Sequence, residues 1–301
     1  MTLRVLQFGS TGQVARAILD AAGARDARVI ALSRQDADLS DATAVGAAVR
    51  AHGSSADVVV NAAAYTAVDA AESDEAAAHA VNAEAPRMMA QACAELSLPL
   101  IHLSTDYVFN GEKSGAYAES DPPDPLNAYG RSKLAGEVAV REALGRSVIL
   151  RTSGVYSATG RNFLTTMLNM PEERETLGVV DDQILSPTAA RDIAETVLTI
   201  AAKVAPNDGP WGTYHFCAAG RTSWAGFAEA IYDAAAPWRS RRPEIKRISS
   251  KEYGAAAARP ANSVLDCAKI EAAFGVRPRP WREALAETVE QFYRQRAGAD
   301  A

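Results

Sequence analysis

The stretch that decides the fold reads Leu3-Arg4-Val5-Leu6-Gln7-Phe8-Gly9-Ser10-Thr11-Gly12-Gln13-Val14-Ala15. An apolar run leads into a glycine turn, and apolar residues at helical spacing follow over Gln13–Ala22. The first glycine permits a tight turn, the second lets the backbone approach a pyrophosphate, and Ala15 is small enough for the helix to pack on the strand. The pattern predicts a dinucleotide-binding loop at Gly9 and Gly12, and the N-terminus of the following helix offers N–H groups to phosphate. The alternative is a purely structural turn.

Strand-like and helix-like segments alternate from this loop as far as Arg151. Continuously apolar strands that alternate with helices are typical of a parallel sheet covered on both faces. The sequence therefore predicts an α/β fold with a Rossmann-like doubly wound sheet. The expected strands are Leu3–Phe8, Arg28–Leu32, Asp57–Val60, Leu100–Leu103 and Val148–Arg151, and the expected helices are Gln13–Ala22, Thr43–Ala51, Glu72–Ala94 and Tyr129–Arg141.

The pattern weakens in the second half, which predicts a smaller C-terminal substrate-binding lobe. We expect residues 1–153, with returning segments at about 189–219, to bind the dinucleotide. Residues of about 154–188 and 220–301 are expected to form the lobe. Its predicted elements, together with those of the returning segments, are the helices Asn162–Leu168, Arg191–Ala202, Trp224–Ala235 and Glu283–Arg294 and the strands Leu177–Val180 and Thr213–Cys217.

The charge balance argues against a nucleic-acid partner. The chain has 31 Lys and Arg against 37 Asp and Glu, a net charge of −6, whereas nucleic-acid binding depends on clustered cations. The short basic cluster Arg239, Arg241 and Arg242 is interpreted as a solvated loop rather than a polyanion site.

Hydropathy and cysteine usage indicate a cytoplasmic protein. Mean hydropathy is −0.12, and the sequence has no apolar run of membrane-spanning length and no pattern of a signal peptide. Three widely spaced cysteines and four scattered histidines predict neither a disulfide framework nor a metal site. The cysteines are Cys93, Cys217 and Cys267.

The residues after the second strand are expected to choose between NADP and NAD. An acidic residue there would bind the ribose 2′-hydroxyl of NAD, whereas this strand ends in Ser33 and Arg34. A hydroxyl and a guanidinium suit a 2′-phosphate, so the sequence favours NADPH, with NADH as the second choice. The alternative is that Arg34 is only solvated and that Asp36 or Asp38 makes the contact.

A tyrosine and a lysine four residues apart, Tyr129 and Lys133, lie on one face of a predicted helix. A tyrosine has a reference pKa of about 10, and an adjacent ammonium could lower it toward neutrality. By itself the spacing is usually that of a surface helix. Thr105, however, follows the fourth strand, at the edge where doubly wound sheets bind ligands. Its hydroxyl could bond a substrate carbonyl beside Tyr129.

These motifs resemble the extended short-chain dehydrogenase/reductases and, more narrowly, the dTDP-4-dehydrorhamnose reductase family. The resemblance covers Leu3 to about Tyr293. Its specific segments are Val60–Asp69, the Ser104–Phe109 run STDYVF, Leu134–Glu137, Asp182-Gln183, Pro187-Thr188 and Arg259–Ser263.

The resemblance implies NADPH-dependent reduction of the 4-keto group of a dTDP-activated deoxysugar, most closely dTDP-4-dehydro-L-rhamnose. It assigns catalysis to Tyr129 as the acid, Lys133 as the residue that holds the nicotinamide ribose and lowers the tyrosine pKa, and Thr105 as the group that orients the keto oxygen. It also assigns residues to the two ligands. These are Gly12, Gln13 and Val14 for the pyrophosphate, Asp38 and Leu39 for the adenine side, Ala62, Ala63 and Ala64 for the cofactor wall, and Thr105 and Asp106 for the sugar.

One departure concerns Gly154, where the family commonly has a tryptophan that contacts the sugar. The redox machinery is unaffected, but the sugar pocket would lose an apolar wall unless Tyr107 or Phe163 fills the gap. We count Gly154 among the predicted substrate-binding positions.

Two other functions remain open at this stage. A nucleotide-sugar epimerase or dehydratase shares the Tyr and Lys but retains NAD. A non-catalytic subunit, such as the regulatory subunit of methionine adenosyltransferase, shares the fold, although retention of Thr105, Tyr129 and Lys133 counts against it. The resemblance also allows a homodimer and a bound Mg²⁺, for which the sequence indicates no ligands.

Overall fold

The computed structural model describes residues 2–206 and 208–299. Positions 1 and 301, which bound the two predicted domains, lie outside the described residues. No helix in the described part of the chain is both long and apolar enough to cross a membrane.

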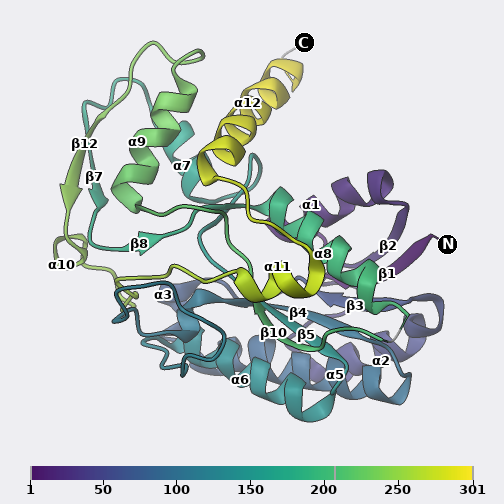
Figure 1. The fold of residues 1–301 in the computed structure, drawn as a ribbon. Helices are drawn as coiled ribbons and strands as arrows, with labels where there is room; N and C mark the ends of the chain where they lie inside the picture. The colour runs from purple at the N-terminus through teal and green to yellow at the C-terminus, as the bar shows by residue number, and fades with distance from the viewer. Residues whose placement is uncertain (1, 207, 300–301) are drawn as a thin grey trace.

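Within residues 2–206 and 208–299, six strands pair in parallel to form the central sheet (Figure 1). The sheet order reverses between β1 and β3, and ligands of doubly wound folds bind at such a switch point, beyond the carboxyl ends of the strands. The predicted Rossmann-like sheet is confirmed. In sheet order the strands are β2 (Ala27–Leu32), β1 (Leu3–Phe8), β3 (Val58–Asn61), β4 (Leu100–Thr105), β5 (Ser147–Thr152) and β10 (Gly212–His215).

Helices cover both faces of the sheet (Figure 1). Successive strand residues alternate between the layers, so Val5 packs in one apolar core and Leu6 in the other. Leu6 faces α2 (Ala42–His52), α5 (Ala85–Glu95) and α6 (Ala128–Ala143). Val5 faces α1 (Gln13–Ala22), α8 (Ala190–Val204) and α11 (Ala268–Phe274).

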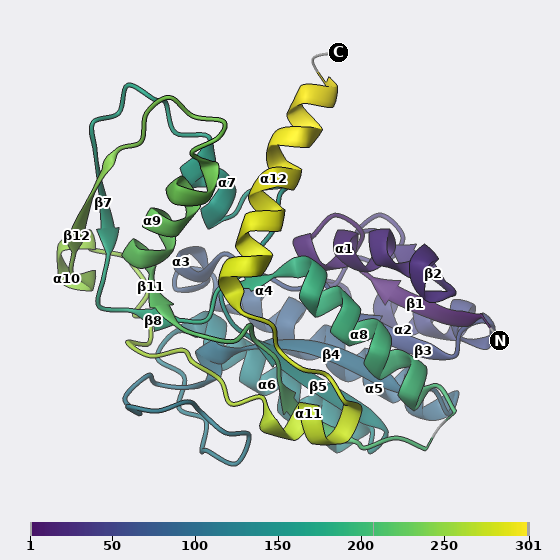
Figure 2. The same cartoon turned by 45° about the horizontal axis from the view of Figure 1, so that its top comes forward.

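A smaller group of elements packs beyond the carboxyl ends of the strands (Figure 2). Its core is rich in aromatic residues, with Tyr156, Phe227 and Trp281 buried together. The elements are α7 (Phe163–Leu168), α9 (Trp224–Ala235), α10 (Ser250–Tyr253), α12 (Trp281–Ala299) and three strand pairs: β7 (Thr176–Val180) with β12 (Glu244–Ile248), β6 (Val155–Tyr156) with β9 (Thr188–Ala189), and β8 (Ile184–Leu185) with β11 (Thr222–Ser223).

The predicted helix over Glu72–Ala94 is present as a continuous helical run, but it starts only at Glu75 and contains a π-helical turn. The structure has α3 (Val68–Ala71), α4 (Glu75–His79), a π-helical turn over Ala80–Glu84 and then α5. Asp74 starts α4 by accepting a hydrogen bond from the Ala77 N–H. Pro86 has no N–H to offer the Asn82 carbonyl, which loosens the helix one turn earlier. Gly136 of α6 packs so closely on that carbonyl that a Cβ would lie 2.0 Å from its oxygen.

Candidate active site

The glycine loop has the shape that a diphosphate requires. Gly9 has a φ of +96°, and a Cβ there would lie 3.2 Å from the Ala63 Cβ, so only glycine fits comfortably. The buried Gln7 holds the turn, because its amide donates to the carbonyls of Gly9 (2.8 Å) and Ala15 (3.1 Å). Gly12 precedes α1 without a side-chain cap, which leaves the first N–H groups of this ten-residue helix available to an anion.

The residues after β3 form the opposite wall of the loop. The buried Asn61 accepts from the Ala63 N–H (3.2 Å) and its amide contacts the Nδ1 atom of His102 (3.0 Å). Burial, together with Lys133, lowers the pKa of His102 well below its usual range, so its ring is neutral. This contact fixes Ala62, Ala63 and Ala64 against the glycine turn.

The end of β2 presents both candidate cofactor-selecting groups. Arg34 is 81% exposed and its Nε atom lies 3.1 Å from the Asp38 carboxylate. The Asp36 carboxylate instead accepts from the N–H and the hydroxyl of Ser33. The Ser33 hydroxyl and the Asp36 carboxylate therefore satisfy each other, whereas the Arg34 guanidinium keeps most of its donors in solvent. Leu39 is buried beside them.

Tyr129, Lys133 and Thr105 come together at the carboxyl end of β4, as the sequence predicts. Asn127 starts α6 by accepting from the Gly130 N–H (2.7 Å), which sets the first turn that carries Tyr129. Lys133 lies one turn later and its ammonium donates to the Leu103 carbonyl of β4 (2.7 Å). The Tyr129 phenol is hydrogen-bonded to the Thr105 hydroxyl.

Burial dominates the electrostatics of this group. It raises the pKa of Tyr129 to about 12, although the hydrogen bond between Tyr129 and Thr105 opposes the rise, so the phenol is a neutral proton donor. Burial also lowers the pKa of Lys133 to about 8, against the opposing effect of Glu137. The expected lowering of the tyrosine pKa by Lys133 is therefore not what this structure shows, because the ammonium points to a backbone carbonyl.

Asp106 sits behind Thr105 and is only 5% exposed. Its carboxylate accepts from the hydroxyls of Thr105 (2.9 Å) and Ser153 (2.9 Å) and also from that of Ser263. Burial raises the pKa of Asp106 to about 6, although these three hydroxyls oppose the rise. Sequence reasoning missed Ser153 and Ser263, which lie on segments far apart in the chain.

A buried ion pair between Glu137 and Arg151 lies next to the site. Glu137 lies one turn after Lys133 on α6 and is fully buried. Its carboxylate accepts from the guanidinium of Arg151 (2.6 and 2.8 Å) and from the Ser104 hydroxyl (2.6 Å). Burial alone would raise the pKa of Glu137, but the guanidinium and Ser104 hold it below its usual range. The pair ties α6, β4 and β5 together at residues that adjoin Thr105 and Lys133 in the chain, and the only signal in the sequence is the spacing of Lys133 and Glu137.

Gly154 follows β5 in a left-handed backbone conformation, with a φ of +59°. A Cβ at this position would lie 2.8 Å from Leu185 Cδ1 and 3.1 Å from the Ser186 carbonyl oxygen. The neighbouring Ser153 bonds Asp106, so Gly154 lies close to the catalytic group in the chain. Leu185 therefore occupies the space into which a side chain at position 154 would extend.

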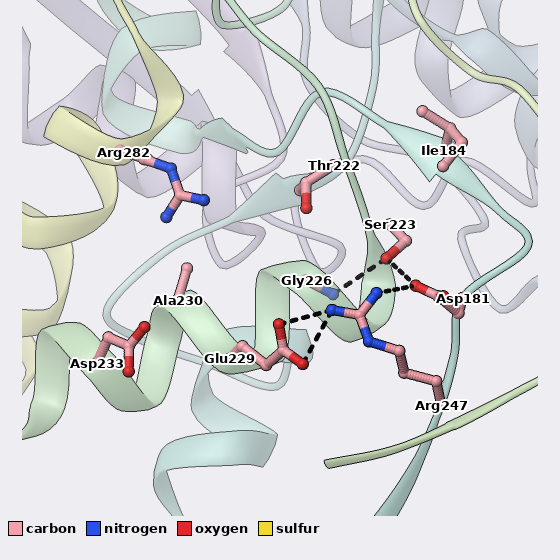
Figure 3. Close-up of a pocket in the computed structure, with 10 residues that line it drawn as sticks. All are labelled: Asp181, Ile184, Thr222, Ser223, Gly226, Glu229, Ala230, Asp233, Arg247 and Arg282. Carbon is pink, nitrogen blue, oxygen red and sulfur yellow. Dashed lines mark hydrogen bonds and ion pairs between the residues drawn. The ribbon is translucent and has the colours of Figure 1, made fainter.

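Two hollows lie outside this group. The one in Figure 3, of about 440 Å³, is lined by charged side chains that pair with one another, Arg247 with Asp181 (2.9 Å) and with Glu229 (2.8 Å). The other, of about 690 Å³, lies between α1, α8 and α12 and includes Gln13 as its only predicted site residue. In the part of the chain that the structure describes, no three His, Cys, Asp or Glu side chains are grouped as metal ligands, so Mg²⁺ gains no support.

Known proteins resemble the chain over nearly its whole length. The family model of the RmlD substrate binding domain matches residues 3–294. A dTDP-4-dehydrorhamnose reductase of Sinorhizobium fredii is 41% identical over 95% of this chain and 97% of its own. That of Escherichia coli is 36% identical over 97% of this chain and 98% of its own.

Solved structures give the same result. A dTDP-4-dehydrorhamnose reductase of Clostridium acetobutylicum superposes with a TM-score of 0.89 at 32% identity, over 97% of this chain and 100% of that one. The Bacillus anthracis enzyme, solved in complex with NADP, gives a TM-score of 0.88 at 32% identity with the same coverage. The chain therefore belongs to the RmlD substrate binding domain family, that of the dTDP-4-dehydrorhamnose reductases.

Proposed function

We propose that this protein is an NADPH-dependent oxidoreductase that reduces the 4-keto group of a dTDP-4-dehydro-6-deoxysugar, dTDP-4-dehydro-L-rhamnose to dTDP-L-rhamnose. The observation that carries the proposal is the hydrogen-bonded pair of Tyr129 and Thr105, with Lys133 one turn below, beside a phosphate-binding glycine loop. Family membership supports the substrate class, and the NADP complex of the Bacillus anthracis relative supports the cofactor.

The residues present fit a dinucleotide. Gly9 and the N-terminus of α1 would hold the diphosphate, Ser33 and Arg34 the adenosine end, and Ala62–Ala64 the wall of the groove. We propose the same division as the sequence: residues up to 153 and about 189–219 bind the cofactor, and the remainder bind the sugar nucleotide. When bound, NADPH supplies the hydride that reduces the keto carbon.

The chain itself supplies position and a proton. The Tyr129 phenol stays protonated at neutral pH because its pKa is raised to about 12, so it can donate to the oxygen that becomes an alkoxide. Thr105 holds the phenol by a hydrogen bond, and Lys133 is fixed by the Leu103 carbonyl with donors left for a ribose. Asp106 and Gly154 would border the sugar.

The test is NADPH consumption by the purified protein with dTDP-, UDP- and GDP-linked 4-keto sugars. We expect turnover with the dTDP-linked 4-keto-6-deoxysugar and formation of its alcohol. A protein that purifies with bound nicotinamide absorbance and interconverts sugars without net oxidation of NADPH would instead be an epimerase or dehydratase. Binding without turnover of any sugar would favour the regulatory subunit.

Replacement of Arg34 by Asp is expected to shift the preference from NADPH toward NADH. The variant removes a charged donor for the 2′-phosphate and adds a repulsive carboxylate, and one charged hydrogen bond contributes about 1.5–3 kcal/mol. The ratio of the two kcat/KM values should therefore change by about tenfold to a hundredfold. Arg241→Asp, the same charge change just before β12, is the matched control. An unchanged ratio in Arg34→Asp would leave the phosphate contact to another residue.

Replacement of Gly154 by Trp is expected to weaken sugar binding. The left-handed backbone costs a non-glycine residue about 1–2 kcal/mol, and the Cβ already meets Leu185 and the Ser186 carbonyl. The KM for the sugar nucleotide should rise while the Kd for NADPH stays nearly constant, measured by nucleotide fluorescence. Gly154→Ala separates the backbone strain from the bulk of the indole. If cofactor affinity alone changed, Gly154 would not border the sugar.

We further propose a cytoplasmic location, in a reducing compartment. The three cysteines are all free thiols, and the Cys217 and Cys267 sulfurs, 3.8 Å apart, share a hydrogen bond. A homodimer remains a prediction, which light scattering on the purified protein would test.

A further inference from the structure

The hydrogen-bonding capacity of the Thr105 hydroxyl is already used up. A hydroxyl has one proton to donate and two lone pairs that accept. Thr105 donates its proton to Asp106 Oδ1 (2.9 Å) and accepts from the Tyr107 N–H (3.2 Å). Its second lone pair is the one available to the Tyr129 phenol, to which it is hydrogen-bonded. In this arrangement Thr105 has no proton left for a substrate oxygen.

The arrangement depends on Asp106 being an acceptor. The carboxylate also accepts from Ser153 Oγ (2.9 Å) and from Ser263, so hydroxyl groups on three segments converge on it. When Tyr129 turns its proton toward a keto oxygen, Thr105 regains a lone pair but still has no free proton. An ionised Asp106 therefore makes Thr105 an acceptor throughout the reaction.

We propose that Asp106 is a positioning residue whose protonation reverses the direction of the Thr105 hydrogen bond. A protonated Asp106 donates to Thr105, and the freed Thr105 proton then turns toward the keto oxygen, beside the phenol of Tyr129. No proton leaves Asp106, since only the direction of the hydrogen bonds changes. Two donors instead of one would then meet the developing alkoxide. This inference rests on the proposed ketone reduction.

Asp106 should titrate within the pH range in which activity can be measured, since burial raises its pKa to about 6. The other titratable groups that face it are the phenols of Tyr107 and Tyr129 and the thiol of Cys217. Burial raises the pKa of both phenols, so they stay neutral across this range. Cys217 requires a control, because its neighbour Cys267 lowers the pKa of its thiol.

The test is the pH profile of kcat/KM for the dTDP-linked 4-keto-6-deoxysugar with saturating NADPH, between pH 5 and 9. One oxyanion donor contributes about 10²–10³ in rate, so the wild type should be at least about tenfold faster on the acid side of a transition near pH 6. Ser153→Ala removes a donor that favours the carboxylate, so its transition should move to higher pH. Asp106→Asn should show no transition there, and Cys217→Ser should retain it.

A second readout tests the titration without turnover. The folded-state pKa of Asp106 lies above that of an unfolded aspartate, so the stability that this one group contributes is complete below about pH 4 and is lost as the pH rises through about 6. Thermal unfolding of Asp106→Asn should lack this decrease. If the enzyme reduces the sugar with the same pH profile in wild type and Asp106→Asn, the inference is wrong. If no 4-keto sugar is reduced at any pH, the proposed function itself fails.

Discussion

Replacing Tyr129 with Phe is expected to lower kcat about 10²- to 10⁴-fold, the range that a positioned general acid contributes. The variant keeps the ring and its edge-to-face contact with Tyr107, at 5.9 Å between centroids, and removes only the hydroxyl. Burial keeps the phenol protonated, and the phenylalanine ring has no proton to donate in its place. Single-turnover oxidation of NADPH by the sugar substrate would measure the chemical step directly.

The matched control is Tyr107→Phe. Tyr107 lies against Tyr129, but its hydroxyl is hydrogen-bonded to Arg259 rather than to Thr105. We expect its kcat to stay within a few-fold of wild type, and the Kd for NADPH to change little in either variant. Near-normal turnover of Tyr129→Phe, or an equal loss in both variants, would contradict the assignment of Tyr129 as the acid.

The sheet and the catalytic trio were predictable because their signals are local. Leu3–Phe8 and the glycine turn adjoin in sequence, and Tyr129 and Lys133 are one helical turn apart. Thr105 could be placed at the same site because parallel strands bring their carboxyl ends to a common edge of the sheet. Among the elements that the pattern missed, β12 and α11 are short, and most of β12 is exposed, so no apolar run marks it.

The environment of Asp106 could not be predicted for a different reason. Ser153 and Ser263 reach it from segments 110 residues apart, and the second is brought in by a crossing segment that bridges Ile184 at Asn262 and Tyr117 at Leu265. No periodicity encodes such a contact. The raised pKa of Asp106 follows from that burial.

The direction in which the Tyr129 pKa shifts also could not be predicted without the structure. From the spacing alone, Lys133 is expected to stabilise the phenolate, since its ammonium lies on the same helical face. The folded chain places that ammonium on the Leu103 carbonyl, and burial raises the pKa of the Tyr129 phenol. The sequence spacing thus predicted that Tyr129 and Lys133 belong to one site, whereas their burial determines their protonation states.

Replacing Glu137 with Gln is expected to lower the free energy of unfolding by about 3–5 kcal/mol, the cost of breaking a buried ion pair from one side. Arg151 is only 3% exposed, and its guanidinium donates two hydrogen bonds to the carboxylate, one of which the amide of Gln cannot accept. Urea unfolding followed by circular dichroism would measure the change. The carboxylate of Glu137 also raises the pKa of Lys133, against the effect of burial. Without that carboxylate, Lys133 should lose its charge at a pH lower than about 8.

Arg141→Gln provides the control for this pair, because Arg141 contacts the same carboxylate at 3.2 Å but is 39% exposed. Exposed pairs contribute about 0–1 kcal/mol, so its effect should be several-fold smaller. A double variant, Glu137→Leu with Arg151→Met, should regain much of the stability, since apolar groups then replace both charges. It should not regain activity, because Ser104 and Lys133 have lost the carboxylate that faces them. Equal destabilisation by the Glu137 and Arg141 variants would show that burial does not set the strength of this pair. Full activity of the double variant would show that the pair supports the fold without positioning the site.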